Sequence, residues 1–91
     1  MAEQVIVTVV GLNRPGVLAE VTGKIARFHG NIMDIGQMMV QNYFHLFMIV
    51  EIDPRRLAFK TFKEGIEKLG EEKGYKVSVQ HSKVFLYMHR I

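Results

Sequence analysis

The sequence predicts an α+β fold in which a four-stranded antiparallel sheet carries two helices on one face. Four segments have the apolar pattern of strands, and two have apolar residues at helical spacing. These segments follow one another in the order β-α-β-β-α-β. Each of the two crossover connections is right-handed by rule, so both helices are expected on the same side of the sheet.

Residues 5–10 are predicted to form the first strand, because nearly all of them are β-branched. Apolar side chains fall on both faces of this segment, which is typical of a central strand. The first helix is predicted from Pro15 to His29, with one apolar stripe: Leu18, Val21, Ile25 and Phe28. Asn13 suits the N-cap, Pro15 suits the first turn, and Gly30 supplies the stop.

Two strands joined by a turn at Asn42 are predicted next, at residues 31–41 and 44–52. Gly36 in the first of them suggests a bulge or a bend. The second strand has one core face: Phe44, Leu46, Met48, Val50 and Ile52. Its other face is more apolar than solvent alone would favour: Tyr43, His45, Phe47, Ile49 and Glu51.

A second helix is predicted to open at Asp53-Pro54, which repeats the pattern of a cap followed by proline, and to end near Gly74. Its apolar stripe is Phe59, Phe62, Ile66 and Leu69. Ala58 and Gly65 are expected to allow close packing. The last strand, residues 75–81, has one polar face.

The expected sheet order is 4-1-3-2, which puts the two most apolar strands in the centre of a ferredoxin-like βαββαβ sandwich. No linker or useful repeat divides the chain, so residues 1–91 are expected to form one domain. Its core is expected at about 4–81, with an extension at 82–91. In that extension Ser82 either caps a short helix or continues the strand, and the pattern leaves both open.

Composition argues against several classes of function. The chain has 91 residues, a net charge of +3 and no cysteine, so a disulfide or a thiolate metal site is excluded. No apolar run is long enough for a membrane span, and Met1–Gln4 do not resemble a secretion signal, so a cytoplasmic protein is expected. Lysines alternate with glutamates on the second predicted helix, which is typical of a solvated face rather than a nucleic-acid surface.

The sequence gives no sign of catalysis. Asp34, Glu51 and Asp53 are the only acids near strand ends, and the four histidines lack metal-ligand spacing. Gly11 and Gly16 belong to no P-loop or dinucleotide signature. RNA-recognition modules share this topology, but they place aromatic residues on both central strands, and the first strand here has none. We therefore expect no enzyme, no metal and no cofactor.

The candidate binding site is the segment Gly11-Leu12-Asn13-Arg14-Pro15-Gly16-Val17-Leu18, between the first strand and the first helix. Unpaired N–H groups and the positive end of the helix dipole favour a carboxylate or phosphate at such a position. The glycines let the backbone come close to a ligand. A plain connection that needs a cap would use the same residues, and both interpretations stay open at this point.

This loop, together with Gly30-Asn31-Ile32 after the first helix, closely resembles the ACT domain, a regulatory amino-acid-binding module. The resemblance extends from Val5 to about His81 in element order and spacing. More narrowly, the Asn31–Ile35 segment and the Tyr87–Ile91 ending resemble small bacterial and archaeal ACT proteins related to glycine-cleavage repressors.

The resemblance implies a non-catalytic sensor that binds an amino acid between two subunits. In serine-binding members the asparagine and backbone of the loop hold one end of the ligand, and an asparagine from the partner holds the other. Asn13 and Asn31 match these positions, with the amides of Arg14–Leu18 and the neighbouring Ile32 completing the implied site. A helix N-terminus suits the α-carboxylate, and an asparagine oxygen can accept from the α-ammonium. Gly11 stands where serine-binding members carry histidine, which puts serine in doubt.

ACT domains generally pair, often edge to edge, so the resemblance also implies a homodimer or homotetramer and a regulated partner protein. The apolar second face includes Ile6, Val10, Phe47 and Ile49, and needs cover from a partner or from the segment with Phe85 and Met88. The alternatives are a regulatory subunit without a small ligand and, more weakly, a nucleic-acid-binding module. Asn13 as a helix cap and Asn31 as a turn residue remain alternative roles.

Overall fold

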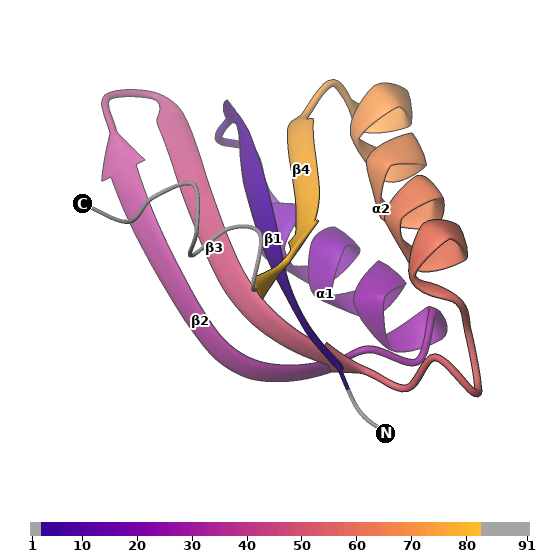
Figure 1. Cartoon of the computed structure of the whole chain (residues 1–91). Coiled ribbons are helices and arrows are strands. Elements are labelled where there is room, and N and C mark those ends of the chain that lie inside the picture. The colour runs from indigo at the N-terminus through magenta and orange to yellow at the C-terminus, as the bar shows by residue number, and fades with distance from the viewer. Residues whose placement is uncertain (1–2, 83–91) are drawn as a thin grey trace.

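Four antiparallel strands and two helices form the structure, a computed structural model that describes residues 3–82 (Figure 1). The elements are β1 (Glu3–Leu12), α1 (Val17–Arg27), β2 (Asn31–Val40), β3 (Tyr43–Ile52), α2 (Phe59–Lys73) and β4 (Lys76–His81). The sheet order is β2-β3-β1-β4, and this confirms the predicted order and the ferredoxin-like fold. The predicted choice between helix and strand for 82–91 concerns residues that lie, except for Ser82, outside the described part of the chain.

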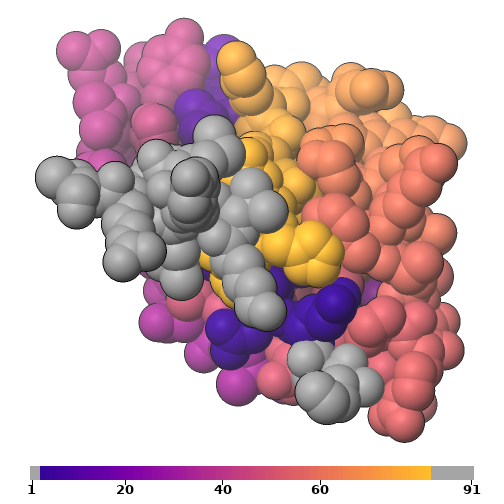
Figure 2. All heavy atoms as spheres, viewed as in Figure 1, coloured from indigo at the N-terminus to yellow at the C-terminus, as the bar shows by residue number. Residues whose placement is uncertain are grey.

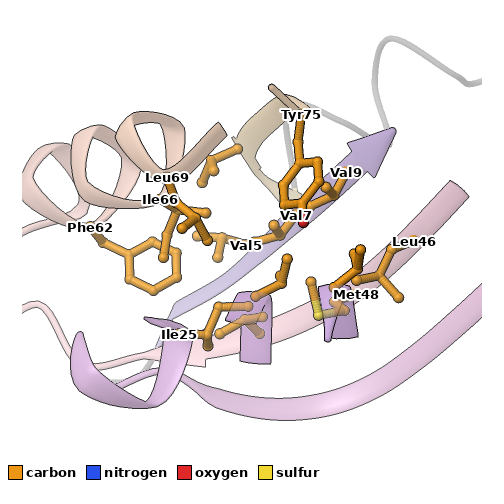
Figure 3. Close-up of a cluster of buried hydrophobic side chains, with 14 of the residues drawn as sticks. Val5, Val7, Val9, Ile25, Leu46, Met48, Phe62, Ile66, Leu69 and Tyr75 are labelled. Atoms are coloured by element: carbon orange, nitrogen blue, oxygen red, sulfur yellow. The ribbon is translucent and has the colours of Figure 1, made fainter. Parts of the chain in front are cut away.

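One hydrophobic core lies between the sheet and the two helices (Figure 3). Alternate residues of β1 and β3 enter it, as predicted: Val5, Val7, Val9, Phe44, Leu46, Met48, Val50 and Ile52. The helices contribute Val17, Val21, Ile25, Phe62, Ile66 and Leu69. Leu18, predicted in the buried stripe, is instead exposed, because Val17 takes the buried position one residue earlier.

The first helix begins later than the sequence predicts. Gly16, in the left-handed conformation with φ 85°, occupies the N-cap of α1, and in the described part of the chain no side chain caps the helix. Asn13 is therefore not the cap, and Pro15 precedes the helix. The physical reason is that β1 continues to Leu12, and the Asn13 N–H donates to the carbonyl oxygen of Asn42 at 2.8 Å.

The second helix also begins later than predicted. Asp53 caps a turn rather than α2: its Oδ1 accepts from the backbone N–H of Arg55 at 3.0 Å. The helix starts at Phe59. Ala58 occupies the N-cap position, and its side chain makes no capping hydrogen bond. Its predicted end is confirmed, since Gly74 closes α2 in the left-handed conformation that many helix ends require.

Two glycines have other roles than predicted. The left-handed residue after α1 is His29, with φ 62°, and not Gly30. A Cβ on Gly30 would lie 2.6 Å from Cγ2 of Ile25, so this glycine allows close helix-to-sheet packing. Gly36 carries no bulge; the irregularity lies between Ile32 and Asp34. The extra residue of β2 is therefore Met33.

The second face of the sheet is less exposed than its composition indicates. Ile6 is buried, Val10 and Ile49 are half-buried, and Phe47 is more exposed. The segment with Phe85 and Met88, predicted as one source of cover, lies outside the described residues. Within residues 3–82, neither helix combines the length and apolar character that a membrane span requires.

Candidate ligand-binding site

The loop between β1 and α1 lies at the same end of the sheet as the turn that joins β2 to β3 (Figure 1). Leu12 pairs with Tyr43, and the Asn13 N–H bond to Asn42 continues this contact into the loop. Residues 12–16 are all exposed. The candidate loop is thus fixed to the sheet at one end and to α1 at the other, with its surface open.

The start of α1 presents unpaired hydrogen-bond donors. Within residues 3–82, three backbone amides here have no hydrogen-bond partner: those of Gly16, Leu18 and Ala19. The first regular helical bond runs from the N–H of Glu20 to the carbonyl of Gly16, at 2.9 Å. The Asn13 side chain also has no hydrogen-bond partner in this part of the chain. The position therefore offers an anion several donors and the positive end of the helix dipole.

On the α2 side of the loop, three side chains bind the carboxylate of Glu20. We call these four residues the Glu20 cluster: Arg14, Glu20, Lys73 and Tyr75. Glu20 Oε1 accepts from Tyr75 Oη at 2.9 Å and lies 3.0 Å from Arg14 Nη2. Lys73 Nζ lies 3.3 Å from Oε2, and the Arg14 guanidinium covers the Tyr75 ring at 5.2 Å. Arg14 is thus held beside α1, and the loop offers a ligand its amides and Asn13.

Electrostatics in the Glu20 cluster follow from this pairing. The hydrogen bond from Tyr75 is the main cause that lowers the pKa of Glu20, with the cations Lys73 and Arg14 acting in the same direction. Burial is the main cause that raises the pKa of Tyr75, and the Glu20 carboxylate adds to it. At neutral pH the carboxylate is charged and the phenol is protonated, which is the pairing the geometry requires.

The Tyr75 ring also explains why a glycine stands at position 11. A Cβ at Gly11 would lie 2.9 Å from Cδ1 of Tyr75 and 3.4 Å from Cε1 of Phe44. The two rings meet edge to face, with centroids 5.5 Å apart. A larger side chain at position 11 has no room, so Gly11 contributes only backbone to the loop. The sequence analysis did not identify Tyr75 or Glu20 as residues of the site. The one available signal was an acidic residue, Glu20, in the first turn of α1, where its charge interacts favourably with the helix dipole.

The other predicted half of the site lies far from the loop. Asn31 opens β2, and the loop lies beside the other end of this strand of ten residues. At about 3.3 Å per residue the separation is roughly 30 Å. Asn31 is exposed, and its side-chain amide contacts Met33 Sδ at 3.4 Å, while Ile32 packs partly against the core. The structure therefore does not bring Asn13 and Asn31 together within one chain.

β2 is an edge strand with apolar side chains exposed on both faces. We call these residues, which are 45–59% exposed, the β2 patch: Met33, Ile35, Met38, Met39 and Val40. Pairing with β3 places Ile35 and Met39 on the helix side, and Met38 and Val40 on the open face. An exposed apolar edge strand is a ready template for pairing with another chain.

The opposite edge of the sheet is different. Lys63 of α2 donates from Nζ to the carbonyl oxygen of Val79 in β4 at 2.9 Å, and its charge is paired with Glu67 at 2.9 Å. The backbone of β2 has no such bond from a side chain of another element within residues 3–82. In the space-filling view the β2–β3 hairpin and α2 form opposite borders of the molecule (Figure 2). Within the same residues, no cluster of His, Cys, Asp or Glu side chains could hold a metal ion.

Comparisons with known proteins agree with this architecture. The family model of the ACT domain matches residues 3–80. A UPF0237 protein of Methanococcus maripaludis is 44% identical over 89 residues, which span 98% of this chain and 99% of the relative. A UPF0237 protein of Methanocaldococcus jannaschii is 42% identical over 88 residues, 97% and 98% of the two chains.

Solved structures show the same fold. An ACT domain protein from Streptococcus pneumoniae superposes with a TM-score of 0.80 and 32% identity, over 93% of this chain and 96% of that one. A candidate glycine cleavage system transcriptional repressor also gives a TM-score of 0.80, at 24% identity. The match covers 90% of this chain but 47% of the repressor, and at this identity it shows similarity of fold.

Proposed function

The chain belongs to the ACT domain family, and we propose that it is a non-catalytic sensor that binds an amino acid between two copies of itself and signals to a partner protein. The observation that carries the proposal is the placement of the loop and Asn31 at opposite ends of an exposed apolar edge strand. Two copies that pair through this strand in antiparallel fashion bring the two halves together.

The proposed register is the one in which the two β2 strands, Asn31–Val40, overlap over their whole length. A two-fold axis at Gly36, with Met33 left out as the bulged residue, places every opposed pair of side chains on the same face. Val40 then faces the partner's Asn31, and Met39 faces the partner's Ile32. A Cβ added at Gly36 would meet nothing within 4 Å among residues 3–82, so the described surroundings of this glycine leave space for close approach at the axis.

In this dimer the partner's Asn31 comes beside the loop at Asn13, and symmetry gives two equivalent sites. The α-carboxylate of an amino acid accepts hydrogen bonds from the amides at the start of α1. The α-ammonium donates to the side-chain oxygen of Asn13 or of the partner's Asn31. Because the ligand contacts both chains, it stabilises one geometry of the dimer, and that geometry is what a regulated protein would read.

The contrast between the two sheet edges supports the choice of β2. Pairing through β4 would compete with the bond from Lys63 to Val79, whereas pairing through β2 buries apolar side chains on both faces. The same β2 patch also fits the alternative of a regulatory subunit that binds another protein without a small ligand. The ligand experiment separates the two.

A thermal-shift screen against the amino acids tests the proposal. A ligand at 100 times its Kd adds about 2.7 kcal/mol to the stability of the folded protein. Asn13→Ala and Asn31→Ala are each expected to abolish the shift while remaining dimers in analytical ultracentrifugation. If no amino acid gives a shift, the sensor is wrong and the ligand-free subunit is favoured.

Mixing the two variants tests whether the site is shared. In a dimer of one Asn13→Ala chain and one Asn31→Ala chain, one site lacks both asparagines and the other keeps both. Random mixing is therefore expected to restore binding to about one quarter of the sites, measured by calorimetry. The matched control is the double variant mixed with Asn13→Ala, which restores none. Equal absence of binding in both mixtures would rule out a site shared in this way.

A further inference from the structure

Exposed apolar side chains are found both at the start of α1 and at the end of β2 on the helix side of the sheet, at Leu18 and Met39. Met39 of β2, Phe44 of β3 and Gly11 of β1 form one cross-strand row on this side, immediately before the loop. Phe44 is fully buried in the core, whereas Met39 is exposed. The side chain at the β2 end of this row is therefore the thioether of Met39.

Leu18, in the first turn of α1, is the exposed apolar side chain on the helix side of this row. α1 turns Ala19, Glu20 and Gly23 toward α2, so Leu18 lies on the flank that faces away from α2 and toward β2. It is 43% exposed. Because the amide of the same residue is one of the unpaired donors at the start of α1, a group bound to this amide lies directly beside the Leu18 side chain.

Four polar side chains beside the loop and the start of α1 are bound to other groups, and the proposed site assigns Asn13, whose side chain is unpaired within residues 3–82, to the α-ammonium. Arg14, Lys73 and Tyr75 all bind Glu20 on the α2 flank of α1. The Thr22 hydroxyl, on the β2 flank, donates to the carbonyl oxygen of Leu18 at 2.8 Å. Gln37 is the nearest remaining polar side chain on the helix side of β2, two residues further toward the centre of the strand, about 7 Å from Met39.

We propose that the bound amino acid has an apolar side chain, which packs between Leu18 and Met39 of one copy and the partner's Ile32. This inference rests on the proposed function, because the dimer register is what opposes Met39 to the partner's Ile32. A hydroxyl or amide packed against these three side chains would lose its bonds to water, and none of the three offers it a strong hydrogen-bonding group in return. Leu18 and Met39 are thus the residues that determine specificity.

Isosteric pairs of amino acids test the inference directly. Valine differs from threonine, and leucine from asparagine, mainly in polarity at similar size. Calorimetry on the full chain is expected to show valine and leucine binding about 10 to 100 times more tightly than their polar counterparts. Tighter binding of serine, threonine or asparagine would overturn the apolar side chain and leave the sensor standing, whereas binding of no amino acid would overturn both.

Two neighbouring methionines supply a matched pair of variants. Met39→Gln is expected to reduce the preference for leucine over asparagine at least about tenfold, because it places an amide in the side-chain space. Met38→Gln changes the neighbouring methionine, which is also exposed but lies on the open face of β2, and is expected to keep the preference. Both substitutions touch the dimer edge alike, so equal effects on the preference would show that Met39 acts through dimerisation, and the inference would be wrong.

Discussion

At the scale of single residues, the Glu20 carboxylate joins three separate parts of the chain. Arg14 belongs to the loop, Lys73 to the last turn of α2, and Tyr75 to the segment before β4. The contact with Tyr75 spans 55 residues of sequence, so it closes the fold around the loop. The contacts of Glu20 therefore help to hold the loop in its orientation, and a ligand can bind the loop without contacting Glu20.

Tyr75→Phe keeps the ring that packs on Phe44 and removes the hydroxyl that donates to Glu20. We expect the free energy of unfolding to fall by about 1 kcal/mol, measured by urea denaturation. Tyr43→Phe is the matched control, because the Tyr43 hydroxyl has no hydrogen bond within residues 3–82 and its ring is half exposed. A loss in Tyr43→Phe as large as in Tyr75→Phe would contradict this role for the hydroxyl.

The pH dependence of stability follows from the lowered pKa of Glu20. A carboxyl whose pKa is lower in the folded than in the unfolded state stabilises the fold above the unfolded pKa. That stability is lost as the pH falls from the usual value of 4.5 through the folded pKa. The difference in urea midpoint between pH 6 and pH 3 is therefore expected to be smaller in Glu20→Gln than in the wild type. An unchanged difference would mean that other carboxyls account for the acid sensitivity.

Residue roles near the loop could be predicted only in part. The position of Asn13 beside α1 follows from local pattern, but its role as cap does not, because the end of β1 depends on Leu12 pairing with Tyr43. Likewise, periodicity cannot pair Glu20 with a tyrosine that lies far away in the sequence. Local rules place the loop, and tertiary contacts decide which of its groups remain available.

At the scale of elements, β2 is the strand whose apolar sequence fits its exposed position least. It is apolar on both faces, yet most of its side chains are exposed, whereas the equally apolar β1 is buried between two neighbours. The sequence pattern correctly placed β1 and β3 in the centre, because alternation and crossover handedness are general rules. The bulge at Met33 was missed, since Gly36 gave the more usual signal for one.

Gly36→Glu tests the proposed two-fold axis. In the paired strands two carboxylates would meet across the axis, so the dimer is expected to dissociate about tenfold or more readily in sedimentation equilibrium. Ser78→Glu places the same charge on the open face of the other edge strand and is expected to leave the dimer unchanged. The two-fold axis at Gly36 would be contradicted if both variants stayed equally dimeric.

At the scale of the whole molecule, the two edges of the sheet determine how far assembly can proceed. A chain with two free edges would pair at both and continue into an open array, whereas a chain with one free edge stops at a dimer. Within residues 3–82 no strand pairs with the outer edge of β2, whereas β4 has a carbonyl bound by Lys63. The sequence left dimer and tetramer open, because the bond from α2 to β4 arises only once the helix has packed on the sheet.

Lys63→Met tests this limit on assembly. The methionine keeps the apolar stem that packs near Phe59 and Val79 but removes the donor to the Val79 carbonyl, so the β4 edge becomes available for pairing. We expect species larger than the dimer in sedimentation velocity, increasing with protein concentration. Lys60→Met, on the exposed side of the same helix and without a bond to the sheet, is the matched control and is expected to stay dimeric. If Lys63→Met also remains a dimer, the limit lies in another feature of β4, since the free carbonyl alone does not recruit a further strand.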